Sequence, residues 1–226
     1  MNSDSVSILK TSSIFSSLNE KELNELASLF NEHKTVANEN IFWEGDPSEW
    51  FYIIARGQIK VTKLSSQGKE MIIAFFGSGE MFGEVAVFED KPYPASAQAV
   101  PETVLLGIRK TDFIAFLLKH PAITLKIIGI LSGRLREAQN RLRDLAGERV
   151  EQRLARILLM LSAKIGATLP FTRQDISDMA GTTTETTIRI FSQWKDRGII
   201  RSLRGKIIIA DETKLKIMAE GATRPG

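Results

Sequence analysis

The feature that most constrains the fold is an apolar repeat between residues 128 and 145. Six apolar residues recur there at alternating spacings of three and four: Ile128, Leu131, Leu135, Ala138, Leu142 and Leu145. This is the a/d pattern of a coiled coil, in which each apolar side chain packs between residues of a facing helix. The partner is either the helix's own domain or a second copy of the chain. Because the seam extends well past the last predicted strand, we expect a parallel homodimer.

The segment that precedes this helix has the pattern of an antiparallel β structure. Between residues 35 and 110, short apolar runs alternate with turn signals, and glycines punctuate them at nearly regular intervals. Many short strands with regular turns are typical of a β sandwich or barrel. The residues SSQGKE, between IKVTKL and MIIAFF, predict the tip of a hairpin.

Helical signals flank the β region on both sides. Residues 1–34 predict short helices, and Asn19 is placed to cap the one that carries an apolar face. The expected members of that face are Leu18, Leu23, Leu26, Leu29 and Phe30. Thr111 is expected to cap the helix DFIAFLLKH, and Pro121 to open the long helix. Gly147 breaks the apolar repeat and is a candidate hinge.

The C-terminal segment predicts a helix-turn-helix. FTRQDISDMA, GTT and TETTIRIFSQWKDRG have the form of a helix, a tight turn and a second helix, after the amphipathic helix ERVEQRLARILLMLSAKIG. Thr172 is expected to cap the first helix, Gly181 to make the turn, and Thr183 or Thr184 to cap the second. The predicted contacts between the two helices join Ile176, Met179 and Ala180 to Ile188, Phe191 and Trp194. Two short strands around Arg204 and Gly205 then predict a small β wing.

The charge of the chain is unevenly distributed. Residues 1–120 hold 11 basic and 16 acidic residues, a net charge of −5, whereas residues 121–226 hold 19 and 11, a net charge of +8. Chance placement of solvated charge is one explanation. The other is a polyanionic partner for the C-terminal half, which the predicted helix-turn-helix favours.

Composition excludes several kinds of chemistry. The chain has no cysteine, so disulfides, iron–sulfur clusters and cysteine-ligated zinc are excluded. The histidines are His33 and His120, and residues 35–110 contain none, which argues against a metalloenzyme on a cupin-like barrel. No apolar run reaches the ~18 residues that a membrane span needs. The N-terminus does not have the pattern of a secretory signal, so we expect a cytoplasmic protein without a membrane partner.

A glutamate and an arginine of the second predicted helix are the candidates for reading DNA bases. Glu185 and Arg189 lie four residues apart, so both project from one helical face. A helix-turn-helix places the N-terminal part of its second helix in the major groove. There glutamate accepts from cytosine N4, and arginine bridges guanine O6 and N7. The alternative is an intrahelical salt bridge on a solvated face.

Polar residues around this pair are expected to contact phosphates or a thymine methyl. Arg173 and Gln174 begin the preceding helix, and threonines surround Glu185. The predicted DNA-binding residues are Thr172, Arg173, Gln174, Thr183, Thr184, Glu185, Thr187, Ile188 and Arg189.

The sequence resembles the CRP/FNR superfamily of bacterial transcription regulators over roughly residues 12–217. Three motifs occur in the family's order: FWEGDPSEWFYIIARGQIKV, GEMFGEVAVFEDKPYPASAQAV and FTRQDISDMAGTTTETTIRI. The resemblance implies an α+β chain with three parts. These are an effector-sensing β-roll of the cyclic-nucleotide-binding type, a double-stranded jelly roll, over residues 1–119; a dimerisation helix over 120–146; and a winged helix-turn-helix over 147–226. It also implies a pseudo-palindromic DNA site and contact with RNA polymerase.

The resemblance gives the base-reading pair and the effector pocket specific expectations. Glu185 and Arg189 match the Glu-x-x-x-Arg pair that reads a TGA-type half-site, whereas Thr184 and Ile188 depart from the residues of the better-known branches. The effector pocket is expected at Gly83, Glu84, Val85, Tyr93, Ala95, Ser96, Arg134, Ala138 and Gln139.

The effector itself is left open by these residues. Gly83 and Glu84 match the part of the pocket that holds a ribose, but Pro94, Ala95 and Ser96 provide no arginine for a cyclic phosphate. A phosphate buried without a cation loses the contact that offsets its desolvation, so cAMP is disfavoured. Heme remains a candidate, because YPASAQAV is similar to an NO-sensing branch of the family. His33 is nevertheless expected at the surface, and His120 at the entry of a helix.

The favoured function is therefore a homodimeric, effector-gated transcription regulator. The alternative is a cyclic-nucleotide-binding protein that acts through protein contacts rather than DNA.

Overall fold

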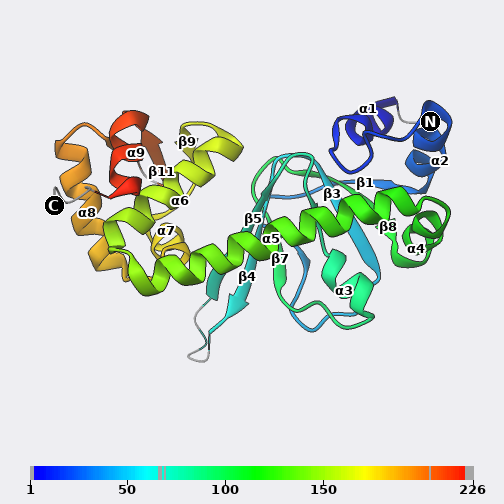
Figure 1. The fold of residues 1–226 in the computed structure, drawn as a ribbon, viewed down its shortest axis with the longest axis horizontal. Helices are drawn as coiled ribbons and strands as arrows, with labels where there is room; N and C mark the ends of the chain where they lie inside the picture. Colours follow the sequence, from blue (N-terminus) through cyan, green and yellow to red (C-terminus); the bar gives the residue numbers. More distant parts are fainter. Residues whose placement is uncertain (1–2, 66–67, 69, 204, 222–226) are drawn as a thin grey trace. The chain divides into compact units, whose positions relative to one another are not determined.

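The computed structural model describes residues 3–65, 68, 70–203 and 205–221. The chain divides into two compact units, Met1–Arg134 and Leu135–Gly226, and the boundary falls inside the longest helix (Figure 1). Among the described residues, no single helix is long and apolar enough to cross a membrane. Two consecutive helices, Lys110–Lys119 and Pro121–Gly147, meet that criterion only when they are taken together, and the chain bends by 113° between them.

The first unit contains two four-stranded antiparallel sheets, which confirms the predicted β architecture. One sheet has the order β1-β8-β3-β6 and the other β2-β7-β4-β5. The strands are β1 (Asn31–Lys34), β2 (Asn40–Phe42), β3 (Trp50–Arg56), β4 (Gln58–Leu64), β5 (Glu70–Gly77), β6 (Met81–Phe82), β7 (Ser96–Ala99) and β8 (Val104–Arg109). Strands β4 and β5 pair up to Leu64 and Glu70 on both sides of the predicted hairpin tip. Residues 66, 67 and 69 of that tip lie outside the described residues.

Strand β1 corrects the prediction that residues 1–34 are helical. It pairs with β8 from Asn31 opposite Gly107 to Lys34 opposite Val104. All four of its residues are exposed. Local sequence therefore gives no apolar alternation, and the strand depends on pairing with residues about 70 positions away or more.

The helices of the first unit are α1 (Ser3–Thr11), α2 (Glu20–Leu29), α3 (Glu84–Glu89), α4 (Lys110–Lys119) and the first half of α5 (Pro121–Gly147). Asn19 caps α2 as predicted, because its side chain accepts from the backbone N–H of Glu22 at 3.0 Å. The expected cap at Thr111 is wrong. Helix α4 begins two residues earlier than predicted, at Lys110 with Arg109 in the cap position, because β8 runs directly into it and Lys110 N donates to the carbonyl of Glu49 at 2.8 Å.

Two apolar cores hold the first unit together. One lies between the β3–β8 sheet and the helices, where Phe51 stacks on Phe113 and Ile123 and Ile127 of α5 are buried. The other lies within the roll, where Tyr93 stacks on Phe42 with ring centroids 3.6 Å apart. Helix α5 is thus attached to the roll through its N-terminal half.

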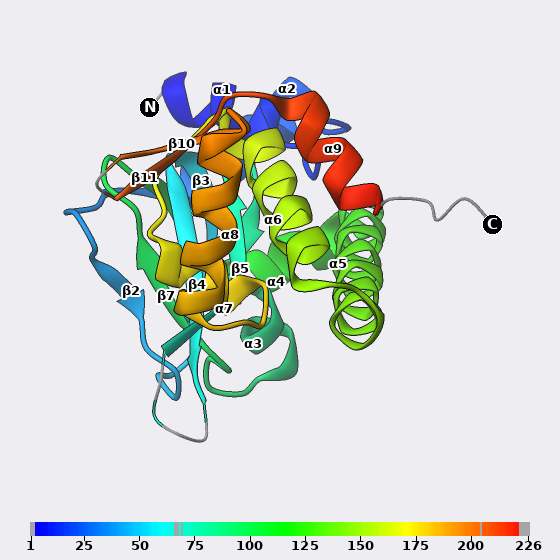
Figure 2. The same ribbon diagram turned by 90° about the vertical axis from the view of Figure 1, so that its left-hand side faces the viewer.

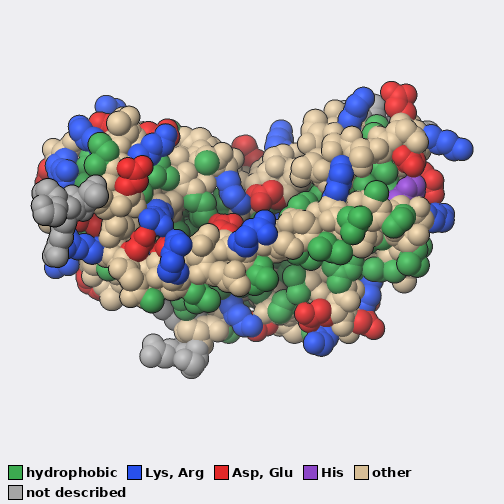
Figure 3. Space-filling model, in the orientation of Figure 1, with side chains coloured by type: hydrophobic (Ala, Val, Ile, Leu, Met, Phe, Trp, Pro, Cys, Tyr) green, Lys and Arg blue, Asp and Glu red, His purple; other side chains and the backbone are tan. Residues whose placement is uncertain are grey.

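Helix α5 confirms the predicted long helix, which begins at Pro121 and ends at Gly147. Leu131 packs partly against the core of the first unit. The exposed large apolar residues of the helix are Leu125, Ile128, Leu135, Leu142 and Leu145. In Figure 3, hydrophobic side chains gather over α3, α4 and the N-terminal half of α5.

The second unit is a winged helix-turn-helix, as predicted. Its elements are α6 (Val150–Ile165), β9 (Thr168–Leu169), α7 (Arg173–Met179), α8 (Thr184–Asp196), β10 (Ile200–Leu203), β11 (Lys206–Ile209) and α9 (Glu212–Glu220). The strands form a sheet of order β10-β11-β9. Figure 2 shows α6 between α8 and α9. Strand β9 and helix α9 have no counterpart in the prediction, and Arg204 of the wing lies outside the described residues.

Caps and a turn glycine set the geometry of the helix-turn-helix. Thr172 accepts from the backbone N–H of Asp175 at 3.1 Å, and Thr183 accepts from that of Thr186 at 3.2 Å. Thr183, rather than Thr184, is therefore the cap of α8. Gly181 in the turn has φ of 60°, a left-handed conformation that glycine adopts without a steric penalty.

Candidate nucleic-acid interface and effector site

The buried face of α8 fixes which side chains the helix presents outward. Thr187, Ile190, Phe191 and Trp194 are buried, and they follow the three-to-four-residue periodicity of one helical face. The predicted packing of Ile188 on α7 is wrong, because Ile188 is 46% exposed. Two residues along a helix correspond to ~200° of rotation, so burying Ile190 turns Ile188 outward.

Glu185, Ile188 and Arg189 share the exposed face of α8. Within the part of the chain that the structure describes, neither Glu185 nor Arg189 forms an ion pair, so the intrahelical salt bridge considered above is not formed. A carboxylate acceptor and a guanidinium donor are therefore presented together near the N-terminus of the second helix. These are groups of the kind that read C·G pairs in the major groove.

The threonines around Glu185 differ in their roles. Thr187 is completely buried, and its hydroxyl donates to the carbonyl of Thr183 at 3.1 Å. The expectation that Thr187 reaches a phosphate or a thymine methyl is therefore wrong. The hydroxyl of Thr184 donates to Oε1 of Gln174, and Nε2 of Gln174 donates to Asp178 at 2.8 Å. Thr184 and Gln174 thus connect the two helices of the motif.

Arg173 connects the first helix of the motif to the wing. Its Nη2 donates to Oγ of Ser202 in β10 at 3.0 Å, and its side chain is exposed. Thr172 and Arg173 both lie at the exposed start of α7, where the unpaired N–H groups of a helix favour an anion.

Two arginines of α6 connect the helix-turn-helix and its neighbouring helices through hydrogen bonds and ion pairs. The sequence did not predict these contacts. The first, Arg153, donates to the carbonyls of Ala180 at 2.9 Å, Gly181 at 3.3 Å and Glu148 at 2.8 Å. It therefore joins the turn of the helix-turn-helix to the junction of α5 and α6. The only signal in the sequence is an arginine on an amphipathic helix, which is too common to predict these contacts.

The second arginine, Arg156, binds the end of α5 to the same unit. Its guanidinium forms ion pairs with Asp144 at 3.0 Å and Glu148 at 2.6 Å, and its Nε donates to the carbonyl of Ala219 at 3.2 Å. The C-terminal half of α5 and the end of α9 are thus both anchored to α6.

In the first unit, the candidate effector site is centred on Glu84. Glu84 is buried at the start of α3, and its Oε1 lies 2.7 Å from Nη1 of Arg134 on α5. Nη2 of Arg134 donates to the carbonyl of Met81 at 2.7 Å, and the guanidinium lies 4.2 Å from the ring centroid of Phe76. Burial raises the pKa of Glu84, and the charge of Arg134 opposes that shift.

The other predicted pocket residues have different surroundings. Tyr93 is buried in the core within the roll. Its hydroxyl donates to the carbonyl of Trp50 at 2.7 Å, and burial raises its pKa to about 12. Ala95 is also buried, whereas Val85 is exposed. The hydroxyl of Ser96 accepts from the backbone N–H of Glu44 at 2.9 Å.

Gly83 precedes α3 in a left-handed conformation with φ of 81°. It caps the short helix that begins with Glu84. Ala138 and Gln139 lie beyond Arg134 in the second unit, and both are exposed.

Both histidines have the surroundings that the sequence predicts. His33 is half exposed on β1, and its Nε2 lies 2.7 Å from Glu39. His120 ends α4, stacks on Phe116 and lies 3.5 Å from Glu22. Over the described ranges, no group of three His, Asp or Glu residues is placed to hold a metal ion.

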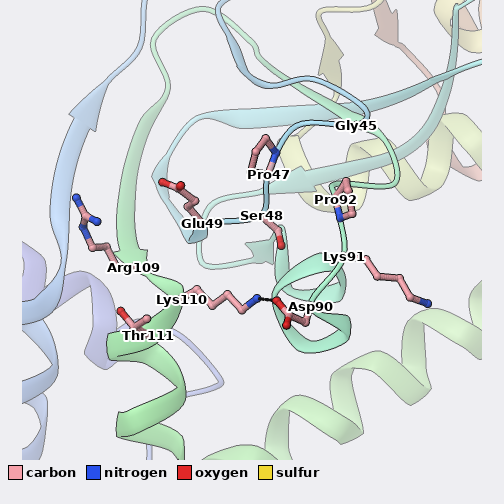
Figure 4. Close-up of a pocket in the computed structure, with 10 residues that line it drawn as sticks. All are labelled: Gly45, Pro47, Ser48, Glu49, Asp90, Lys91, Pro92, Arg109, Lys110 and Thr111. Atoms are coloured by element: carbon pink, nitrogen blue, oxygen red, sulfur yellow. Dashed lines mark hydrogen bonds and ion pairs between the residues drawn. The ribbon is translucent and has the colours of Figure 1, made fainter.

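A separate depression of about 520 Å³ lies on the surface of the roll, between the end of α3 and the start of α4. Its lining includes Ser48, Asp90, Lys91, Arg109 and Lys110. Figure 4 shows Lys110 paired with Asp90, while Lys91 and Arg109 point to opposite sides. This arrangement presents no converging set of charges among the described residues.

Each of the two units contains a segment that matches a known protein family. Residues 32–120 match the family model of the cyclic nucleotide-binding domain, and residues 152–218 match that of the Crp-like helix-turn-helix domain. The chain is also 28% identical to the cyclic AMP receptor protein of Thermus thermophilus over 214 residues, which cover 94% of this chain and 99% of the relative. The chain belongs to the CRP/FNR superfamily of transcription regulators.

Solved structures of bacterial regulatory proteins share the fold. FixK2 from Bradyrhizobium japonicum superposes with a TM-score of 0.73 at 24% identity, over 84% of this chain and 96% of the other. A regulatory protein from Silicibacter pomeroyi superposes with a TM-score of 0.67 at 26% identity, over 97% of this chain and 100% of the other. The relatives support a CRP/FNR transcription regulator with effector-binding and DNA-binding parts, rather than the alternative of a protein that acts through protein contacts.

Proposed function

We propose that this CRP/FNR regulator binds a pseudo-palindromic DNA site as a homodimer and reads each half-site with Glu185 and Arg189. The observation that carries the proposal is the exposed state of both side chains on α8, next to Ile188 and without an ion pair to any described residue. The buried residues of α8 fix the orientation of this face, and Thr183 caps the N-terminus of the helix. Arg189 would bridge guanine O6 and N7, and Glu185 would accept from cytosine N4.

The dimer is proposed to form through α5. Ile128, Leu135 and Leu142 are exposed at intervals of seven residues, which is the spacing of one coiled-coil position. An apolar stripe of this kind is stabilised when a second copy covers it. Two copies would place two α8 helices against half-sites about one helical turn of DNA apart.

The effector is proposed to act at the pair Glu84–Arg134. An effector that binds Glu84 or Arg134 more tightly in the DNA-binding conformation than in the other shifts the population toward DNA binding. Pro94, Ala95 and Ser96 offer no cation to a buried phosphate, so we propose an effector other than cAMP. We further propose that the protein acts in the cytoplasm and contacts RNA polymerase.

DNA selection tests the central proposal. The full-length protein would be used to enrich binding sites from a random duplex library, and the enriched site would be titrated by fluorescence anisotropy. We expect an inverted repeat with a G·C pair in each half, and an affinity that falls steeply as salt rises through counterion release. A failure to enrich any sequence, or an affinity independent of salt, would contradict the proposal.

Titrations of the same protein separate the effector candidates. cAMP should produce no heat in calorimetry and no change in DNA affinity at concentrations that saturate a cAMP receptor. Hemin, added with and without NO, tests the heme alternative, which requires a Soret band that shifts with NO.

A further inference from the structure

Ile188 is an apolar side chain on the face of α8 that the fold leaves outward. It is 46% exposed, and it lies three residues after Glu185 and directly before Arg189. Packing of the helix does not require it, because Ile190, Phe191 and Trp194 form the buried face. Ile188 is therefore available for a contact outside the unit.

We propose that Ile188 recognises the C5-methyl group of a thymine in each half-site. This inference rests on the proposed function, in which the outward face of α8 enters the major groove. Isoleucine has no hydrogen-bond donor or acceptor in its side chain, so it cannot read the polar edge of a base. Among the four bases, thymine alone presents an apolar group in the major groove.

The neighbours of Ile188 place this contact beside the polar contacts of the same helix. Arg189 adjoins it in sequence, and Glu185 lies one helical turn before it on the same exposed face. The thymine is therefore expected in a base pair adjacent to the one that these two residues read. The side chain is also stiff, since a β-branched residue in a helix has one strongly preferred χ1 rotamer. Little rotamer freedom is lost when its methyl groups contact DNA.

Removal of individual thymine methyl groups from the DNA tests the proposed contact with Ile188. After enrichment of a site by the full-length protein, each thymine of one half-site would be replaced in turn by deoxyuridine, which lacks only the C5-methyl group. We expect one thymine whose replacement weakens binding by about fourfold, the effect of removing one buried methyl group. With Ile188→Ser, the same replacement should leave the affinity unchanged.

Ile217→Ser is a matched control, because Ile217 is an exposed isoleucine of α9 in the same unit. This variant should keep the full sensitivity to deoxyuridine. The inference is overturned if an enriched site shows no thymine with this effect, or if Ile188→Ser retains it. A failure to enrich any site would instead refute the proposed function, so the two failures are distinguishable.

Discussion

The carboxylate of Glu84 and the guanidinium of Arg134 form an ion pair of 2.7 Å, in which Glu84 is almost completely buried. The two residues lie 50 positions apart, one at the start of α3 and the other on α5. Arg134 is also the last residue of the first unit. The pair thus attaches the long helix to the β-roll at the point where that unit ends.

Replacement of Arg134 should destabilise the first unit. Arg134→Met would leave the buried Glu84 without its cation, and removing one partner of a buried pair costs about 3–5 kcal/mol. The double variant Glu84→Gln/Arg134→Met should recover much of this loss, since no buried charge remains. Urea denaturation of the wild type, Glu84→Gln, Arg134→Met and the double variant measures the coupling. Additive losses in the double variant would show that the pair is not coupled.

The stability of the protein should depend on pH through Glu84. Its pKa is raised by burial, with Arg134 opposing the shift, so the folded state favours the protonated carboxyl more than the unfolded state does. The stability that this raised pKa contributes is fully present at pH values below 4.5, the ordinary pKa of a glutamate. It is lost as the pH rises through the pKa of Glu84 in the folded state. Denaturation from pH 4 upward should show this decline in the wild type and less of it in Glu84→Gln. Glu89→Gln, an exposed change on the same helix, should retain it.

Arg189→Ala should weaken binding to the enriched DNA site by roughly 1–3 kcal/mol and relax discrimination at one base pair. The reason is the loss of a bidentate contact to guanine. Lys195→Ala is the control, because Lys195 is an exposed cation near the far end of the same helix. It should leave base discrimination intact. An equal loss of affinity for random and enriched DNA with Arg189→Ala would indicate a phosphate contact instead.

Charges within the exposed stripe of α5 should dissociate the proposed dimer. Leu135→Glu combined with Leu142→Glu places two carboxylates of each copy against their counterparts, which a coiled-coil interface does not tolerate. Sedimentation analysis should then give the mass of a monomer. Leu118→Glu changes an exposed leucine of α4 outside the stripe and should leave the dimer unchanged. A double variant that remains dimeric would refute the α5 interface.

The elements that could be predicted from the sequence are those that local residues determine. Asn19, Thr172 and Thr183 cap helices through bonds to residues three positions away, so a short stretch of sequence contains the whole interaction. The apolar repeat of α5 and the punctuated strands of the roll depend on equally local patterns.

The predictions that failed involve contacts that a local pattern does not specify. Strand β1 exists because it pairs with β8, and its own residues are polar. Thr187 is buried and Ile188 does not pack on α7, because Ile190, which the prediction left out of the packing, is part of the buried face of α8. In each case the deciding partner is distant in sequence or in helical phase.

The contacts of Arg153 and Arg156 have a consequence for exchanging parts between proteins. They make the last turns of α5, the turn of the helix-turn-helix and the end of α9 into one piece that begins at Leu135. A graft made at Gly147, where the helix ends, would separate Arg156 from Asp144. A graft made between residues 134 and 135, with the helical register kept, transfers the winged helix-turn-helix together with the part of α5 that Arg156 contacts. Evolution and protein engineering can therefore replace the sensor in front of residue 135 without redesigning the winged helix-turn-helix that it controls.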